Sequence, residues 1–196
     1  MNDSHDPADR QARFGAPLLG RRALLAGFGA TALVAGMGIA PGEAHARTPV
    51  ARRIGLKSIH TGESIDVTFQ EHGHFDPRAL DEINHVLRDH RTGDVEAIDP
   101  ALLVLLTDLR TRMDSNASFN IISGYRSPRT NAALAAKSGG VAKKSFHMRG
   151  MAIDCNLPGR DLLKLHKAAR AAKAGGVGLY QRSNFVHMDT GRVRYW

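Results

Sequence analysis

The chain has 196 residues, of which 42% are hydrophobic, a single cysteine and a formal net charge of +8. This length suffices for one domain with a hydrophobic core, and the lone Cys155 excludes an internal disulfide. The positive charge favours an anionic partner, but Lys and Arg are not interleaved with aromatic residues along any stretch, so we expect no nucleic-acid partner.

Residues 1–46 have the order of an export signal. Arg21-Arg22 precede an uncharged run from Ala23 to Ala40, and the small-residue triplet Ala44-His45-Ala46 follows. This order predicts a signal peptide, and the paired arginines predict the twin-arginine route to the periplasm. The alternative is a retained membrane anchor, because about 18 apolar residues can span a bilayer. We expect removal of the signal, which leaves a mature domain of residues 47–196 that is not attached to a membrane.

The positive charge belongs to the mature domain. The leader contains four arginines and four acidic residues, so its own net charge is zero. An exported basic domain meets little nucleic acid, and anionic cell-wall material is its expected partner.

The first half of the mature domain is predicted to contain a strand and two helices. Residues 64–69 alternate like an edge or surface strand. Asp76-Pro77 is a helix start signal, with Asp as N-cap and Pro at the first helical position, and the helix is expected to end near residue 93. Asp99-Pro100 repeats this signal, and a row of leucines carries a second helix to about Met113.

The second half is predicted to alternate strands with helices. Together with the first half, it gives about four helices and a small antiparallel sheet with flanking helices, which is an α+β fold. The elements expected here are strand 119–123, helix 129–137, strand 151–156, helix 160–173, a glycine-rich strand or bend at 175–180 and strand 184–189.

A histidine and an aspartate are placed to meet near the strand at 151–156. Residues two apart on a strand share a face, so Ala152 and Asp154 point the same way. Gly150 allows the chain to turn so that His147 folds back toward Asp154. Taken alone, such a pair is common on protein surfaces.

His187 lies in the last predicted strand, with Phe185 and Asp189 on its own face. If this strand pairs beside residues 151–156, one face of the sheet presents Asp154 and His187, with His147 beside them. Two imidazoles and one carboxylate are good zinc ligands, and three protein ligands leave a fourth position for water, as in catalytic sites. The same ligands also suit iron or manganese.

Three ordered motifs resemble those of the zinc D-alanyl-D-alanine carboxypeptidase-like metallopeptidases, the LAS group, and most of all its murein endopeptidase K branch. The likeness extends over most of the mature chain. The motifs are Ser123-Gly-Tyr-Arg126-Ser, Ser145-x-His147-x-x-Gly150-x-Ala152-x-Asp154 and Asn184-Phe-Val-His187-x-Asp189-x-Gly191.

This resemblance implies a function and a fold. It implies zinc bound by His147, Asp154 and His187, in the compact α+β fold shared with the hedgehog signalling domain. It also implies hydrolysis of peptide cross-links in peptidoglycan, with a preference for the link between two diaminopimelate residues. Arg126 matches the family arginine near the metal, where a guanidinium can bind a substrate carboxylate or an oxyanion. The alternative for Arg126 is a turn arginine in a salt bridge.

The general base is not assigned by the resemblance. Many relatives carry His, Asp or Glu two or three residues before the last zinc ligand, where this chain has Phe185 and Asn184. Asp189 is the nearest carboxylate on the same strand face. It can act as the base that accepts a proton from the attacking water, or as a partner that orients a ligand imidazole, and both roles stay open.

We therefore expect a periplasmic zinc-dependent murein endopeptidase whose partner is peptidoglycan. One alternative is a D-alanyl-D-alanine carboxypeptidase, and another is a wall-binding protein that retains zinc without turnover. Tyr195 and Trp196 are expected to serve packing.

Overall fold

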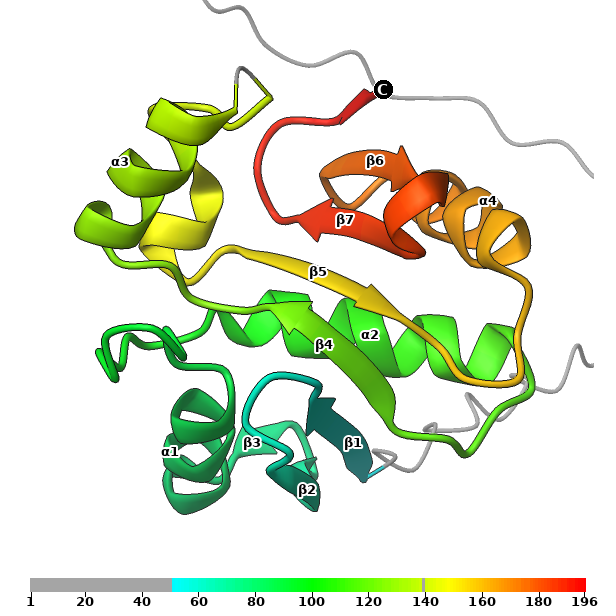
Figure 1. The fold of residues 1–196 in the computed structure, drawn as a ribbon. Coiled ribbons are helices and arrows are strands. Elements are labelled where there is room, and N and C mark those ends of the chain that lie inside the picture. Colours follow the sequence, from blue (N-terminus) through cyan, green and yellow to red (C-terminus); the bar gives the residue numbers. More distant parts are fainter. Residues whose placement is uncertain (1–50, 139) are drawn as a thin grey trace, which may run out of the picture. The chain divides into compact units, whose positions relative to one another are not determined.

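The structure, a computed structural model, describes residues 51–138 and 140–196. The predicted export signal lies outside these residues. They form one eight-stranded sheet with the strand order β3-β2-β1-β4-β5-β7-β6-β8, together with four α-helices and two short 3-10 helices, η1 and η2 (Figure 1). The strands are β1 (Arg52–Ser58), β2 (Ser64–Glu71), β3 (His74–Phe75), β4 (Phe119–Ser123), β5 (Ala152–Asn156), β6 (Gly176–Tyr180), β7 (Phe185–Asp189) and β8 (Arg194–Tyr195). The helices are α1 (Pro77–Val86), α2 (Pro100–Arg112), α3 (Pro128–Lys137), α4 (Leu162–Ala172), η1 (Phe146–Arg149) and η2 (Gln181–Ser183).

The predicted α+β class is confirmed, but the sheet is larger than expected. Its pairs are antiparallel except for β1 with β4 and β6 with β8, which are parallel. The first half of the domain contributes β1, β2 and β3, of which the sequence indicated only β2. Strand β1 was missed because its alternation rests on only two large apolar side chains, Ile54 and Leu56, which lie between the exposed Arg53 and Lys57.

The helices begin where the sequence predicted. Asp76 and Asp99 accept hydrogen bonds from the amides of Arg78 and Ala101, both at 2.9 Å, and so cap α1 and α2. Helix α1 ends at Val86 rather than near residue 93, because the following residues form a turn that is closed by backbone hydrogen bonds to Asp89.

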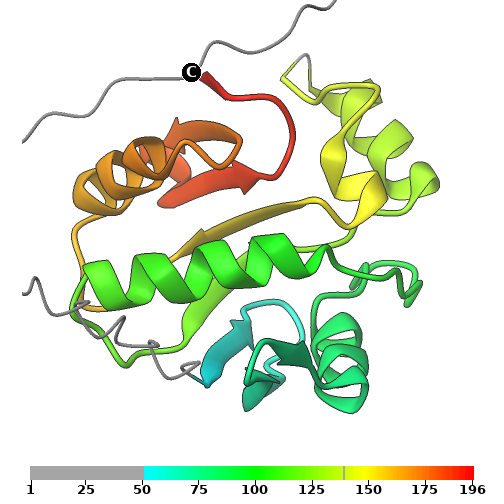
Figure 2. The same ribbon diagram turned by 180° about the vertical axis from the view of Figure 1, so that it is seen from behind.

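The hydrophobic core lies between the sheet and the helices α1, α2 and α4. Figures 1 and 2 show α2 crossing one face of the sheet, and it contacts both β1 and α4. Its buried leucines include Leu103 and Leu106, and each fully buried leucine contributes about 2 kcal/mol of transfer free energy. Ile153 and Met188 face the same core from β5 and β7. The alternate residues of these two strands therefore face the opposite side of the sheet.

Cys155 is fully buried in the core. Burial raises the pKa of its thiol, and Asp154 adds to this shift. This environment suits a small apolar side chain rather than a nucleophile. Within the described residues, no helix combines the length and hydropathy needed to cross a membrane.

Candidate metal centre

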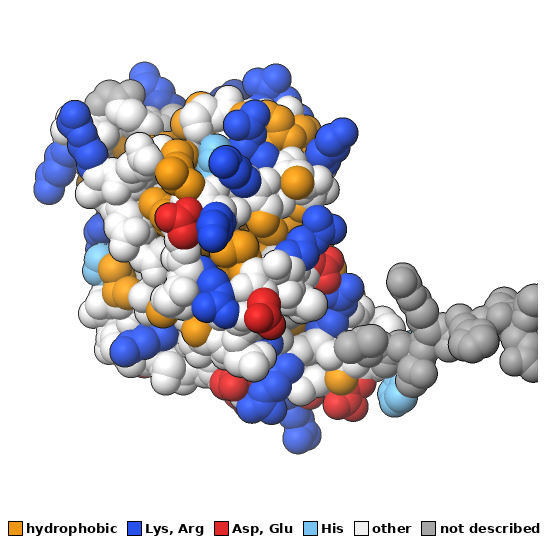
Figure 3. All heavy atoms as spheres, turned by 90° about the vertical axis from the view of Figure 1, so that its right-hand side faces the viewer, with side chains coloured by type: hydrophobic (Ala, Val, Ile, Leu, Met, Phe, Trp, Pro, Cys, Tyr) orange, Lys and Arg blue, Asp and Glu red, His pale blue; other side chains and the backbone are white. Residues whose placement is uncertain are grey.

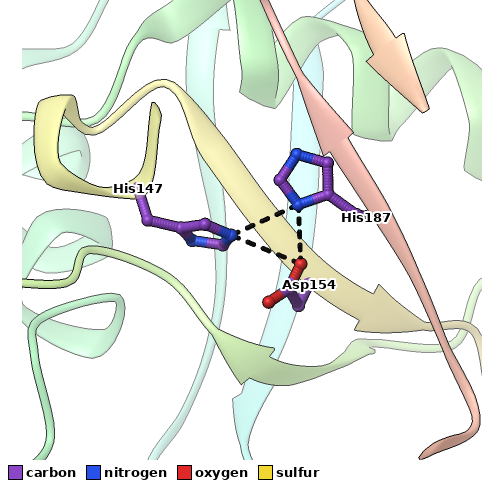
Figure 4. A group of neighbouring side chains, drawn as sticks. All are labelled: His147, Asp154 and His187. Carbon is purple, nitrogen blue, oxygen red and sulfur yellow. Dashed lines mark hydrogen bonds and ion pairs between the residues drawn. The ribbon is translucent and has the colours of Figure 1, made fainter. Parts of the chain in front are cut away.

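His147, Asp154 and His187 converge on one point of the sheet face that lies opposite the core. Strands β5 and β7 are antiparallel neighbours, and their register places Asp154 directly opposite His187. Asp154 Oδ1 lies 2.8 Å from His187 Nδ1 and 3.3 Å from His147 Nε2, and the two ring nitrogens are 3.3 Å apart. Figure 4 shows the three side chains pointing toward one another from η1, β5 and β7.

His147 reaches this point because η1 folds back over β5. Ser145 caps η1, and Gly150 ends it with a left-handed backbone at φ 64°. A side chain at Gly150 would also place its Cβ only 2.0 Å from the carbonyl oxygen of Ala97. Both the left-handed backbone and this close contact therefore require glycine at position 150. His147 Nδ1 lies 2.7 Å from the carbonyl oxygen of Gly124 and donates to it, which leaves the lone pair of Nε2 directed at Asp154 and His187.

His187 is oriented by Asp189, two residues along β7. Its Nε2 lies 3.0 Å from Asp189 Oδ2, so a proton on Nε2 is donated there and the Nδ1 lone pair faces the site. Burial lowers the pKa of His187, but hydrogen bonds to Asp154 and Asp189 outweigh it and raise the pKa overall.

Asp189 is itself fully buried and its oxygens are saturated with donors. Arg194 donates to both oxygens at 3.0 and 2.7 Å, and the amides of Gly176 and Gly191 donate to Oδ1 at 3.1 and 2.9 Å. Burial alone would raise the pKa of Asp189, but these bonds and the one from His187 lower it below its usual range. Asp189 therefore holds a negative charge behind His187, away from the other two members of the cluster.

Arg126 stands beside the cluster on the turn that precedes α3. Its Nη2 lies 3.2 Å from Ser123 Oγ and 3.5 Å from Asp154 Oδ2, and its amide donates to the carbonyl oxygen of His147 at 3.1 Å. The side chain is 11% exposed, and its Nε has no hydrogen-bond partner among the described residues. Burial lowers the pKa of this guanidinium, and Asp154 partly offsets the effect. A largely buried guanidinium at a cleft, with a donor that has no protein partner, is suited to bind an anionic group.

Asp89 supports that turn, and sequence reasoning missed it. Its carboxylate is buried and accepts hydrogen bonds from the amides of Ser127 at 2.9 Å and Arg91 at 3.0 Å. Tyr125 adds a backbone bond of 2.7 Å to the carbonyl oxygen of Leu87. Asp89 thus fixes the residue next to Arg126, through a contact 38 residues apart that no local pattern could indicate.

The cluster opens into a cleft of ≈ 590 Å³. Asp154 is the only Asp or Glu that lines it within the described residues. Phe185, one of the two positions at which the family resemblance led us to look for a base, stacks on Tyr180 at 4.6 Å between ring centroids. The other lining residues include Lys144, Phe146, Arg192, Arg194 and Trp196.

Trp196 lines this cleft in addition to packing, a position that the sequence did not indicate. Its indole nitrogen donates to the Tyr180 hydroxyl at 2.9 Å, and its ring lies 5.2 Å from that of His187. The indole fits over Gly178, where any Cβ would lie 2.5 Å from it. Half of its surface remains exposed, so it forms part of the cleft wall.

The donor set fits a metal ion. Each of the three residues offers one ligand atom, and these atoms lie within 4.8 Å of one another. Both imidazoles have their second nitrogen fixed by an acceptor, which is the arrangement that orients metal-binding histidines. The residues that the sequence nominated, including Arg126 and Asp189, are thus brought together at one site that can hold a metal ion.

Comparison with known proteins shows a matching family model and several similar proteins. A family model described as peptidoglycan L,D-endopeptidase MepK matches residues 46–196. The chain is 44% identical over 176 residues to the peptidoglycan L,D-endopeptidase MepK of Escherichia coli strain K12, which covers 90% of this chain and 96% of that protein. It is 40% identical over 150 residues to a probable peptidoglycan L,D-endopeptidase MepK of Haemophilus influenzae, which covers 76% of this chain and 81% of that protein.

Proposed function

Because the chain belongs to the MepK family of peptidoglycan L,D-endopeptidases and is a murein endopeptidase, we propose that it is a zinc enzyme that cleaves the link between two diaminopimelate residues. The observation that carries the zinc assignment is the convergence of His147, Asp154 and His187, since two imidazoles and one carboxylate are a usual ligand set for catalytic zinc. The names of the relatives support an L,D-bond, and the family resemblance supports diaminopimelate on both sides of it.

The residues of the cleft have different roles in the proposed reaction. His147, Asp154 and His187 would hold the zinc, which would supply an acidified water and a Lewis acid for the scissile carbonyl. Arg126 stabilises the negative charge that develops on the carbonyl oxygen, or binds a carboxylate of the substrate, through donors that already face the cleft. His147 and His187 keep their metal-binding nitrogens aimed because Gly124 and Asp189 hold the opposite ring nitrogens.

We propose the orienting role for Asp189 rather than the role of general base. Its side chain is fully buried, and both oxygens are occupied by Arg194, His187 and two backbone amides. A base must reach the attacking water within hydrogen-bond distance, and Asp189 lies behind His187. Its negative charge instead strengthens His187 as a ligand.

The zinc assignment is tested with the purified mature domain and its His187→Ala variant. Cross-linked muropeptide dimers should yield monomers, and chelation should abolish this cleavage until zinc is returned. His187→Ala should be inactive and bind metal poorly, whereas the matched control His72→Ala, at an exposed position, should behave as the wild type. Cleavage that survives both chelation and His187→Ala would refute the proposal.

The same digests identify the bond. Mass spectrometry of the monomers should place the cut between two diaminopimelate residues. Stems that lose one terminal D-alanine while dimers persist would instead support the carboxypeptidase alternative. Binding without any product would support the non-catalytic alternative, for which the absence of a base at Asn184 and Phe185 argues.

We further propose that the protein works in the periplasm after twin-arginine export and removal of residues 1–46. The paired arginines and the small-residue triplet support this. Replacing Arg21 and Arg22 with lysine should retain the protein in the cytoplasm, as measured by fractionation. Periplasmic protein from the parent should have the mass of a chain that starts at Arg47, and an intact leader on that protein would contradict the cleavage.

A further inference from the structure

Charged side chains are divided unequally between two parts of the domain. The N-terminal part, residues 51–114, has eight Lys and Arg against 12 Asp and Glu. The C-terminal part, residues 115–196, has 14 against three, and two of these three acids are Asp154 and Asp189 at the metal centre. The surface of the C-terminal part is therefore almost purely cationic.

Helix α4 concentrates this charge. Lys164, Lys167 and Arg170 are exposed on α4 and three residues apart, so they are neighbours along the helix surface, and the exposed Lys173 follows as the C-cap residue. The ion pairs found within the described residues involve none of these four side chains. Figure 3, which views the molecule from the side on which α4 lies in Figure 1, shows only Lys and Arg among the charged side chains at the top, and both signs of charge from the middle of this face downward. Neighbouring like charges repel, and an anionic partner would relieve that repulsion.

One of these cations is held in place by an aromatic ring. The guanidinium of Arg170 lies 4.6 Å from the ring centroid of Tyr195, and the Tyr195 hydroxyl donates to the carbonyl oxygen of Arg170 at 3.1 Å. Lys167, Arg170, Ala171 and Tyr195 enclose a depression of ≈ 330 Å³. The surface therefore has a fixed hollow as well as charge.

This surface adjoins the catalytic cleft across a single strand. Side chains alternate along β8 and the residue that follows it, so Arg194 and Trp196 line the cleft while Tyr195 packs against α4. A polymer that enters the cleft can continue over the edge of the sheet onto α4 without leaving the protein.

We propose that the α4 face, defined by Lys164, Lys167, Arg170, Lys173 and Tyr195, is a docking surface for intact peptidoglycan that binds carboxylates of stems next to the one in the cleft. This rests on the proposed function, because the polymer is then the substrate of the adjoining cleft. The occupant is a polymer with repeated carboxylates, which matches a row of cations along a helix better than a single small anion does.

The test separates binding of the polymer from cleavage of a small substrate. The variant carries Lys164→Gln, Lys167→Gln and Lys173→Gln, which removes three charges and keeps residues of similar helix propensity. The matched control carries Lys57→Gln, Arg78→Gln and Arg112→Gln, three exposed cations of the N-terminal part that take part in none of the described ion pairs. Each protein is assayed for cosedimentation with purified sacculi at several salt concentrations and for cleavage of soluble muropeptide dimers.

The α4 variant should bind sacculi about tenfold more weakly, with a smaller salt dependence, because exposed charge contacts are individually weak and add up. Its cleavage of soluble dimers should equal that of the wild type, and a version with Arg at the three positions should restore binding. The control should bind sacculi as the wild type does.

Two results would overturn the proposal. One is an equal loss of sacculus binding in the α4 variant and the control, which would indicate only an effect of net charge. The other is binding of sacculi by the α4 variant at the wild-type level. In that second case, binding to vesicles of anionic phospholipid is measured as well, and its loss in the α4 variant would make a membrane surface the occupant. Failure of the wild type to cleave soluble dimers would refute the proposed function separately.

Discussion

The N-terminal and C-terminal parts use their charged side chains in different ways. In the N-terminal part, three of the eight cations are paired with acids, as in Arg52 with Asp108 at 2.6 Å and Arg88 with Glu63 at 2.7 Å. In the C-terminal part, the buried acids Asp154 and Asp189 serve the metal centre, and none of the lysines takes part in an ion pair within the described residues. The comparison teaches that the N-terminal part supplies support, whereas the C-terminal part carries the site and its outer surface.

Removing a cleft residue of the C-terminal part should have the largest effect on activity and little on stability. Arg126→Ala is expected to lower kcat by about 10²- to 10³-fold, because it removes a donor placed for developing negative charge. Kinetics on muropeptide dimers, with the melting temperature as a check, measure this. Arg129→Ala, at an exposed position three residues away, is the matched control. If the kcat of Arg126→Ala is within about twofold of the wild-type value, Arg126 has only the structural role of an arginine in a turn.

Removing a core residue of the N-terminal part should have the opposite profile. Leu103 on α2 is fully buried, and Leu103→Ala is expected to lower the free energy of unfolding by about 3 kcal/mol while kcat per folded molecule stays unchanged. Denaturant unfolding measures the free energy of unfolding, and kinetics on muropeptide dimers measure kcat. Leu163→Ala, where the side chain is 42% exposed, should cost less than about 0.5 kcal/mol. A clear loss of kcat in Leu103→Ala would show that the two parts are not separable.

Replacing Asp189 sharpens the comparison within the C-terminal part. Asp189→Asn is expected to weaken metal affinity by about 10- to 100-fold, because His187 loses a charged partner. Competition with a chromophoric chelator measures the affinity. If Asp189 orients His187, the Asp189→Asn variant should regain much of its activity at saturating zinc. If Asp189 is the general base, the loss of activity should persist at saturating zinc. Asp161→Asn is the control, because Asn caps a helix about as well as Asp.

The smallest effect is expected at an ion pair of the N-terminal part. Hydrogen bonds from Arg88 and Thr61 lower the pKa of Glu63 from 4.5 to about 2. Because the folded state has the lower pKa, the stabilisation is complete above pH 4.5 and is lost as the pH falls toward 2. Glu63→Gln should therefore lower the free energy of unfolding by about 0.5 kcal/mol at pH 7, with a difference that shrinks in acid. If the difference in the free energy of unfolding between the wild type and Glu63→Gln is the same at pH 7 as near pH 2, the lowered pKa of Glu63 is contradicted. Glu71→Gln, an exposed acid outside the described ion pairs, is the control.

Local signals predicted the helices and most of the site. Asp76 and Asp99 cap helices through contacts two residues away, so their patterns are visible in sequence. The family expected from three motifs is confirmed, and the alternation of β5 and β7 placed Asp154 and His187 on one face.

What the sequence did not indicate depends on distant contacts. Strand β1 gains its place from pairing with β2 and β4, whereas in the sequence only two large apolar residues, Ile54 and Leu56, mark it. Asp89 acts on a turn 38 residues away, and Trp196 fits over a glycine of another strand. Such contacts depend on how elements meet in space, which no window of residues reveals.

The register between β5 and β7 has a consequence for folding errors. Val186 and Met188 alternate with His187, and both are fully buried in the core. A slip of one residue would turn these two apolar side chains outward and force His187 and Asp189 into the hydrophobic interior. The misaligned pairing that destroys the site is thus also the one that the core penalises most, so a chain that has folded stably has its metal ligands in place.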